Sequence, residues 1–103
     1  MTMIVITGTI PTRAEKREAA IEAMVTMQKA SQAEAGCNKY QFGWAAEDPS
    51  IAIIFEEWVD QAALDAHFAT PHMAAFGGAL KDIVSGAGSV MRYEVSKSGP
   101  LGG

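Results

Sequence analysis

The segment from residue 51 to residue 58, IAIIFEEW, constrains the fold most, because apolar residues occupy both of its faces. Successive side chains of a strand point to opposite sides of a sheet. The two apolar sets are Ile51, Ile53 and Phe55 at odd positions and Ala52, Ile54 and Trp58 at even positions. A chain of 103 residues holds one small domain, whose helices cover only one of these sets. The other set requires cover from outside the domain.

The remaining patterns divide the chain into strand, helix, strand, strand, broken helix and strand. The four predicted strands are Met3–Ile10, Cys37–Trp44, Ile51–Val59 and Ser89–Val95. Thr12 and Glu15 have the spacing of a capping box at the start of the first helix, and Gly36 ends it. Ala20, Ile21, Met24 and Met27 follow at helical spacing.

Two caps define the broken helix. Asp60 is a good N-cap for a short helix that carries Leu64, His67 and Phe68. Thr70 and Pro71 then start a second helical segment, with Pro71 at its first position.

This order predicts an α+β fold, a ferredoxin-like split βαβ sandwich over residues 1–96 with a disordered tail at 97–103. Both helical segments then cover one face of a four-stranded antiparallel sheet. The other face would expose an apolar patch of roughly several hundred Å². Monomeric soluble proteins rarely expose a contiguous apolar patch larger than this. We therefore expect a homodimer that packs sheet on sheet.

Composition excludes several classes of protein. Eight basic residues against twelve acidic ones give a net charge of −4, which disfavours a nucleic-acid surface. The longest apolar run, Ile51–Phe55, is far short of the roughly 20 residues that span a bilayer. The first residues lack the basic region of a signal peptide, and the one cysteine, Cys37, has no internal disulfide partner. We expect a soluble cytoplasmic protein.

The two histidines, His67 and His72, indicate a pocket between the sheet and the helices, with Trp58 as its floor. A neutral imidazole there could take a proton from a phenolic O–H or an acidic C–H near neutral pH. The alternative is a core histidine that is hydrogen-bonded to backbone. The residues expected around the pocket are Tyr40, Phe42, Ile54, Glu56, Leu64, Phe68, His72, Met73, Phe76 and Tyr93.

A metal site is not expected. A spacing of five places the two histidine rings on different faces of a helix, and the carboxylates considered as partners, Glu56 and Asp65, do not complete a set of four ligands. Cys37 lies in a predicted strand and is expected to be inert. No dinucleotide or phosphate-loop motif indicates a nucleotide cofactor.

Two stretches resemble the antibiotic biosynthesis monooxygenase family, and within it the quinol monooxygenases. They are EAGCNKY at residues 34–40 and the run from Glu57 to Met73, which contains Trp58, His67 and His72. The resemblance extends from about Met3 to Val95. It implies a dimeric α/β barrel that oxygenates quinols, anthrones or similar aromatics with O2, without metal, flavin or haem.

Comparing single positions with the branches of the family narrows the class of substrate that the resemblance implies. Trp58 matches a strand tryptophan beside the pocket of antibiotic-maturing members, but their asparagine and tyrosine correspond to Ile54 and Leu64, which argues against an anthrone. The haem-degrading branch has a tryptophan at His67 and a histidine at Gly77, which argues against haem cleavage. The resemblance therefore implies His67 as a base or anion stabiliser, with Trp58, Tyr40 and Phe76 as pocket walls.

Three functions stay open at this point. The first is a cofactor-independent monooxygenase acting on a quinol or polyphenol with O2. The second is an isomerase or tautomerase in the same pocket; a phosphorylated substrate would need a cation from Arg92, Lys39 or Lys81. The third is a non-catalytic binding module. Consumption of O2 distinguishes the first from the others.

Overall fold

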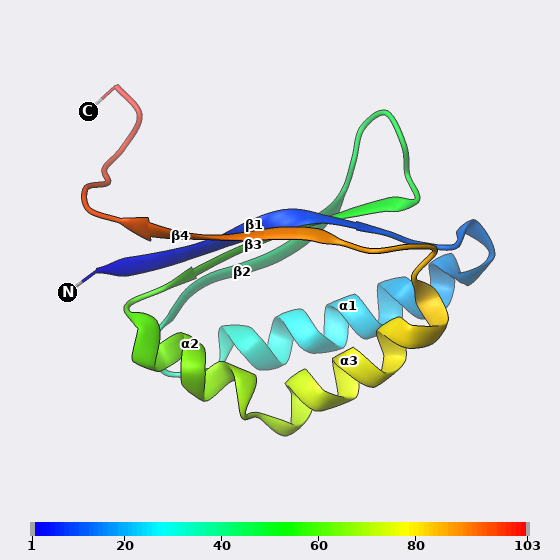
Figure 1. The fold of residues 1–103 in the computed structure, drawn as a ribbon, viewed down its shortest axis with the longest axis horizontal. Helices are drawn as coiled ribbons and strands as arrows, with labels where there is room; N and C mark the ends of the chain where they lie inside the picture. The colour runs from blue at the N-terminus through cyan, green and yellow to red at the C-terminus, as the bar shows by residue number, and fades with distance from the viewer. Residues whose placement is uncertain (1, 103) are drawn as a thin grey trace.

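The computed structural model describes residues 2–102, which form one antiparallel sheet with helices against one face (Figure 1). The strands are β1 (Met3–Pro11), β2 (Cys37–Trp44), β3 (Ile51–Trp58) and β4 (Ser89–Val95). A short 3-10 turn, η1 (Ala14–Lys16), leads into α1 (Arg17–Gln32), and α2 (Gln61–Phe68) and α3 (Pro71–Ile83) follow β3. The sheet order β2-β3-β1-β4 confirms the predicted ferredoxin-like α+β fold.

The end of the chain was predicted to be a disordered tail. Residues 97–102 form neither helix nor strand, and Gly103 lies outside the described residues.

The core lies between the sheet and the helices. Alternate residues of the two central strands point toward the helices and are buried, including Ile4 and Ile6 from β1 and Ile54 and Trp58 from β3. Helices α1 and α3 lie side by side below this face (Figure 1). The even positions of residues 51–58 are therefore the set that the helices cover.

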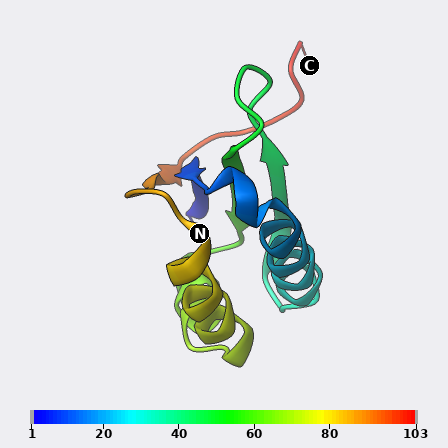
Figure 2. The same cartoon turned by 90° about the vertical axis from the view of Figure 1, so that its right-hand side faces the viewer.

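The opposite face of the sheet has no helix from residues 2–102 against it (Figure 2). Ile53 and Phe55 from β3 are exposed there, and the strand register adds Met91 and Tyr93 from β4, which are about half exposed. An apolar strip of this kind agrees with the sheet-on-sheet dimer, which stays a prediction.

The start of the first helix differs from the prediction. The Thr12 hydroxyl donates a hydrogen bond to the carbonyl of Ser50 at 2.6 Å, so it caps no helix, and the chain enters α1 through η1 instead. The predicted capping box is therefore wrong: a contact with a residue 38 positions away replaces the local one. Ile21 is also exposed, because the buried stripe continues from Met24 and Met27 to Ser31.

The caps of α2 and α3 are confirmed. Asp60 Oδ1 accepts from the backbone N–H of Ala63 at 2.9 Å, and Thr70 Oγ1 accepts from that of Met73 at 3.2 Å. The Thr70–Pro71 junction ends one helix and starts the next, so the chain changes direction between the two histidines.

Gly36 fixes the loop that follows α1. Its φ of +82° is in the left-handed region, and an added Cβ would lie 2.6 Å from the Cβ of Ala63 on α2. Glycine thus allows the loop that carries Glu34 to lie directly against α2.

Candidate functional site

A cavity of about 340 Å³ lies between the helix-facing side of the sheet and α2 and α3. Most of its wall is apolar, and the sheet residues on its floor come from all four strands. Its lining residues are Ile6, Ile10, Tyr40, Ile54, Glu56, Leu64, Phe68, Met73, Phe76, Gly77, Leu80, Val90, Met91 and Arg92. An apolar cavity with a few polar groups is the usual form of a small-molecule site.

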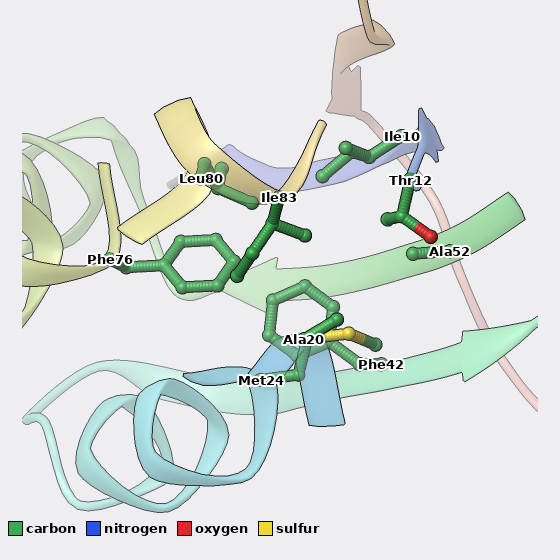
Figure 3. Close-up of a pocket in the computed structure, with 9 residues that line it drawn as sticks. All are labelled: Ile10, Thr12, Ala20, Met24, Phe42, Ala52, Phe76, Leu80 and Ile83. Atoms are coloured by element: carbon green, nitrogen blue, oxygen red, sulfur yellow. The ribbon is translucent and has the colours of Figure 1, made fainter. Parts of the chain in front are cut away.

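The neighbouring part of the core has no room for a ligand. A void of only about 10 Å³ remains between α1, α3 and the sheet, among the side chains drawn in Figure 3. Phe42 and Phe76 fill it, with ring centroids 5.3 Å apart. Phe42 was predicted to line the pocket, but it packs here, and Phe76 separates this closed region from the cavity.

Glu56 is the acidic residue among those that line the cavity. It is buried, and its Oε1 accepts a hydrogen bond of 2.9 Å from Nε1 of Trp58, two positions along the same strand face. Burial raises the pKa of the Glu56 carboxyl, while the bond from Trp58 and the nearby His67 oppose the shift. A carboxyl of this kind exchanges a proton closer to neutral pH than an exposed one does.

The two histidines meet at Glu34. Oε2 of Glu34 lies 2.6 Å from Nδ1 of His67 and 2.7 Å from Nε2 of His72. Because a carboxylate only accepts, each of these ring nitrogens carries the proton that it donates. His67 is buried under the indole of Trp58, with ring centroids 4.6 Å apart, whereas His72 is partly exposed in a groove between α1 and α3.

This convergence corrects the prediction that the two rings lie on different faces of a helix. The spacing of five does not run along one helix, because α2 ends at Phe68 and α3 starts at Pro71. Neither carboxylate considered from the sequence takes part, since Glu56 contacts Trp58 and Asp65 contacts Gln61.

Glu34, His67 and His72 are also the described residues that could hold a metal ion, with their ligand atoms within 4.8 Å of one another. In the present arrangement the Glu34 oxygen lies between the two nitrogens and bonds to both. Two ligand atoms that are each about 2.0–2.1 Å from a tetrahedral zinc lie roughly 3.4 Å apart, so metal binding here would require both hydrogen bonds to open. In the present arrangement the three residues form a hydrogen-bonded cluster.

The structure brings most of the predicted pocket residues together. Those that line the cavity are Tyr40, Ile54, Glu56, Leu64, Phe68, Met73 and Phe76. Trp58 and His67 lie directly behind this wall and are almost fully buried. His72 lies in the groove between α1 and α3 instead.

Tyr93 was predicted to line the pocket, and that is wrong. It pairs with Val5 on the outer side of the sheet, and it is Arg92, the next residue back, that lines the cavity. The segment SVMRYEV at residues 89–95 has apolar side chains at both odd and even positions. The sequence therefore did not indicate whether the odd or the even side chains face the helices. Glu34 was also missed as a site residue, because no local pattern relates it to residues 67 and 72.

The surroundings of Cys37 are consistent with the predicted inert cysteine. Burial, with the negative charges of Glu34 and Glu56, raises the pKa of its thiol to about 11. A thiol with that pKa is a poor nucleophile at neutral pH.

A ferredoxin-like sheet with an apolar, carboxyl-bearing cavity under its helices defines a class of small-molecule-binding α+β domains. Residues 3–79 match the family described as antibiotic biosynthesis monooxygenase, and the chain belongs to that family. The family and the names of its relatives indicate a monooxygenase-like kind of protein. No helix within residues 2–102 combines the length and the apolar character needed to cross a bilayer.

Relatives cover nearly the whole chain. "Putative monooxygenase YcnE" of Bacillus subtilis is 30% identical over 95 residues, which are 92% of this chain and 100% of the relative. An uncharacterized protein of Synechocystis is 30% identical over 95% of this chain and 67% of its own length. The solved structure of Rv0793 from Mycobacterium tuberculosis shares the fold, with a TM-score of 0.87 at 19% identity over 95% of this chain and 99% of that one.

Proposed function

We propose that the protein is a cofactor-independent monooxygenase that oxidises a quinol or another electron-rich aromatic compound with O2 in this cavity. The observation that carries the proposal is the buried carboxyl of Glu56 on the floor of a mostly apolar cavity. The apolar wall suits a flat aromatic ring, and the carboxyl supplies a base where a ring hydroxyl would lie. Membership of the monooxygenase family supports the reaction class.

In this proposal Glu56 is the group that takes the phenolic proton. Its raised pKa brings its basicity closer to that of a working general base. His67 was expected to be the base from the resemblance, but Glu56 is the residue that lines the cavity. We assign His67 and Trp58 as positioning residues: Trp58 holds Glu56 by its indole N–H, and His67 packs against that indole.

The reaction balances without a further reductant. Loss of the phenolic proton to Glu56 gives an electron-rich phenolate, which passes one electron to O2. The resulting radicals combine to form a C–O bond, and the peroxide takes the proton back from Glu56 to give a ring hydroperoxide. Its O–O bond then breaks as the proton on that ring carbon leaves. A hydroquinone and O2 thus give a hydroxyquinone and water, with one oxygen atom in each product and four electrons moved from the ring to O2.

The test compares O2 uptake with a panel of quinols for the wild type, Glu56→Gln and Glu57→Gln. Glu57 is the matched control, because it follows Glu56 on β3 and points to the other side of the sheet. General-base catalysis contributes about 10²–10⁴-fold, so Glu56→Gln should lose uptake by about that factor while Glu57→Gln keeps it. Uptake by Glu56→Gln at the wild-type rate would contradict the role of Glu56.

The same carboxyl favours one other candidate, an isomerase or tautomerase that moves a proton without O2. Product formation under strict anaerobiosis would identify it. Ligand binding with no chemical change in either atmosphere would instead indicate a binding module.

A further inference from the structure

Four residues from the four strands form one row across the floor of the cavity. Tyr40 pairs with Glu56, Glu56 with Ile6, and Ile6 with Arg92. Residues directly opposite one another in a sheet share a face, and all four line the cavity. Adjacent strands lie about 4.8 Å apart, so the Cα atoms of Glu56 and Arg92 are separated by about 10 Å, with Ile6 between them.

Arg92 is the one basic residue among the described residues that line this cavity. The other cations considered from the sequence lie elsewhere: Lys39 is opposite Glu57 on the outer face, and Lys81 is exposed on α3. The row therefore has the carboxyl of Glu56 on one side of the apolar Ile6 and the guanidinium of Arg92 on the other.

The guanidinium of Arg92 is only loosely engaged. Its Nη1 lies 3.3 Å from Oε1 of Gln61 and 3.4 Å from Oε1 of Glu94, which are long distances for hydrogen bonds. The Arg92 side chain is 47% exposed and that of Glu94 is 66% exposed, so this ion pair is a weak one at the cavity edge. A guanidinium has five N–H donors, and it can bind a planar anion through two of them.

We propose that the substrate is an aromatic acid, with a hydroxyl group at one end of a flat ring system and a carboxylate at the other. The hydroxyl contacts Glu56, the ring lies over Ile6, and the carboxylate binds the Arg92 guanidinium. The carboxylate stays near solvent at the edge, so little charge has to be buried. This inference rests on the proposed function only in that it places the reacting hydroxyl at Glu56.

The test measures binding by calorimetry in the absence of O2, with 6-hydroxy-2-naphthoate and its neutral carboxamide as probes. Hydrogen bonds to charged groups contribute about 1.5–3 kcal/mol, which corresponds to roughly 10- to 150-fold in affinity. The wild type should bind the acid more tightly than the amide by about this factor. Arg92→Gln should remove that preference, with the loss of affinity falling mainly on the acid. Lys81→Gln removes an exposed positive charge from the same protein and should leave the preference intact.

Equal binding of acid and amide by the wild type would overturn the inference, as would failure of both to bind. An equal loss of both probes in Arg92→Gln would assign Arg92 a structural role and would also overturn it. The outcome is separate from that of the oxygenase proposal. Selective acid binding without O2 uptake would refute the oxygenase alone, and uptake with neutral quinols without acid selectivity would refute the Arg92 subsite alone.

Discussion

Glu56 carries an ionisable carboxyl in the core, and the stability of the fold depends on pH because of it. Burial raises the pKa of its carboxyl in the folded state above that in the unfolded chain. The folded state therefore holds its proton more tightly, and the protonated carboxyl stabilises the fold below the unfolded pKa. This stabilisation is lost as pH rises through the folded pKa.

Glu56→Gln should remove this pH dependence, because the amide stays neutral and its oxygen can still accept from Trp58. We expect the free energy of unfolding of the variant to exceed that of the wild type at neutral pH, with the difference shrinking in acid. Urea unfolding between about pH 4 and 8 measures it. A difference that grows toward acid would contradict the direction of the shift.

Glu34 holds two histidines with one carboxylate oxygen. Glu34→Ala leaves Nδ1 of the buried His67 without this partner, and an unsatisfied buried group costs about 1–3 kcal/mol. Thermal unfolding should show that loss, while Glu18→Ala on the exposed face of α1 serves as the control. Equal melting temperatures for the two variants would show that the cluster adds nothing to stability.

At the scale of elements, the pairing of β1 with β4 depends on Gly8. An added Cβ at this position would lie 2.1 Å from the carbonyl oxygen of Ser89, which is backbone and cannot move aside cheaply. Gly8→Ala should therefore destabilise the fold and loosen β4, which carries Arg92. Gly43→Ala in β2 is the matched control, because its Cβ would meet no atom within 4 Å. Hydrogen exchange of the β4 amides measures the effect, and equal protection in both variants would contradict it.

Elements were predictable where their determinants are local. Asp60 and Thr70 cap helices through residues three positions away, so the sequence around them was enough. Thr12 has the same local pattern, but its hydroxyl bonds to Ser50 across the fold. The meeting of His67 and His72 at Glu34 likewise needs the turn between α2 and α3 and the loop at Gly36, which no spacing reveals. Which side chains of β4 face the helices depends on its register with β1, so the sequence offered Arg92, Lys39 and Lys81 alike and only the structure shows that Arg92 lines the cavity.

At the scale of the whole molecule, the uncovered face of the sheet predicts a dimer. Ile53, Phe55, Met91 and Tyr93 are exposed large apolar residues on that face, and a second copy would bury them. Light scattering should give twice 10.9 kDa. Phe55→Lys should produce monomers, whereas Val25→Lys, at an equally exposed apolar residue on α1, should not. A monomeric wild type would contradict the dimer.

In the proposed reaction this cavity inserts oxygen from O2 into an aromatic ring without a cofactor. The decisive measurement is mass spectrometry of the product that forms under isotopically labelled O2, with protein first stripped of metal by a chelator. We expect one labelled oxygen atom in the quinone product of the wild type and the other in water, with the amount of labelled product strongly reduced in Glu56→Gln. Unlabelled product, or activity that returns only when a metal or flavin is added back, would contradict it.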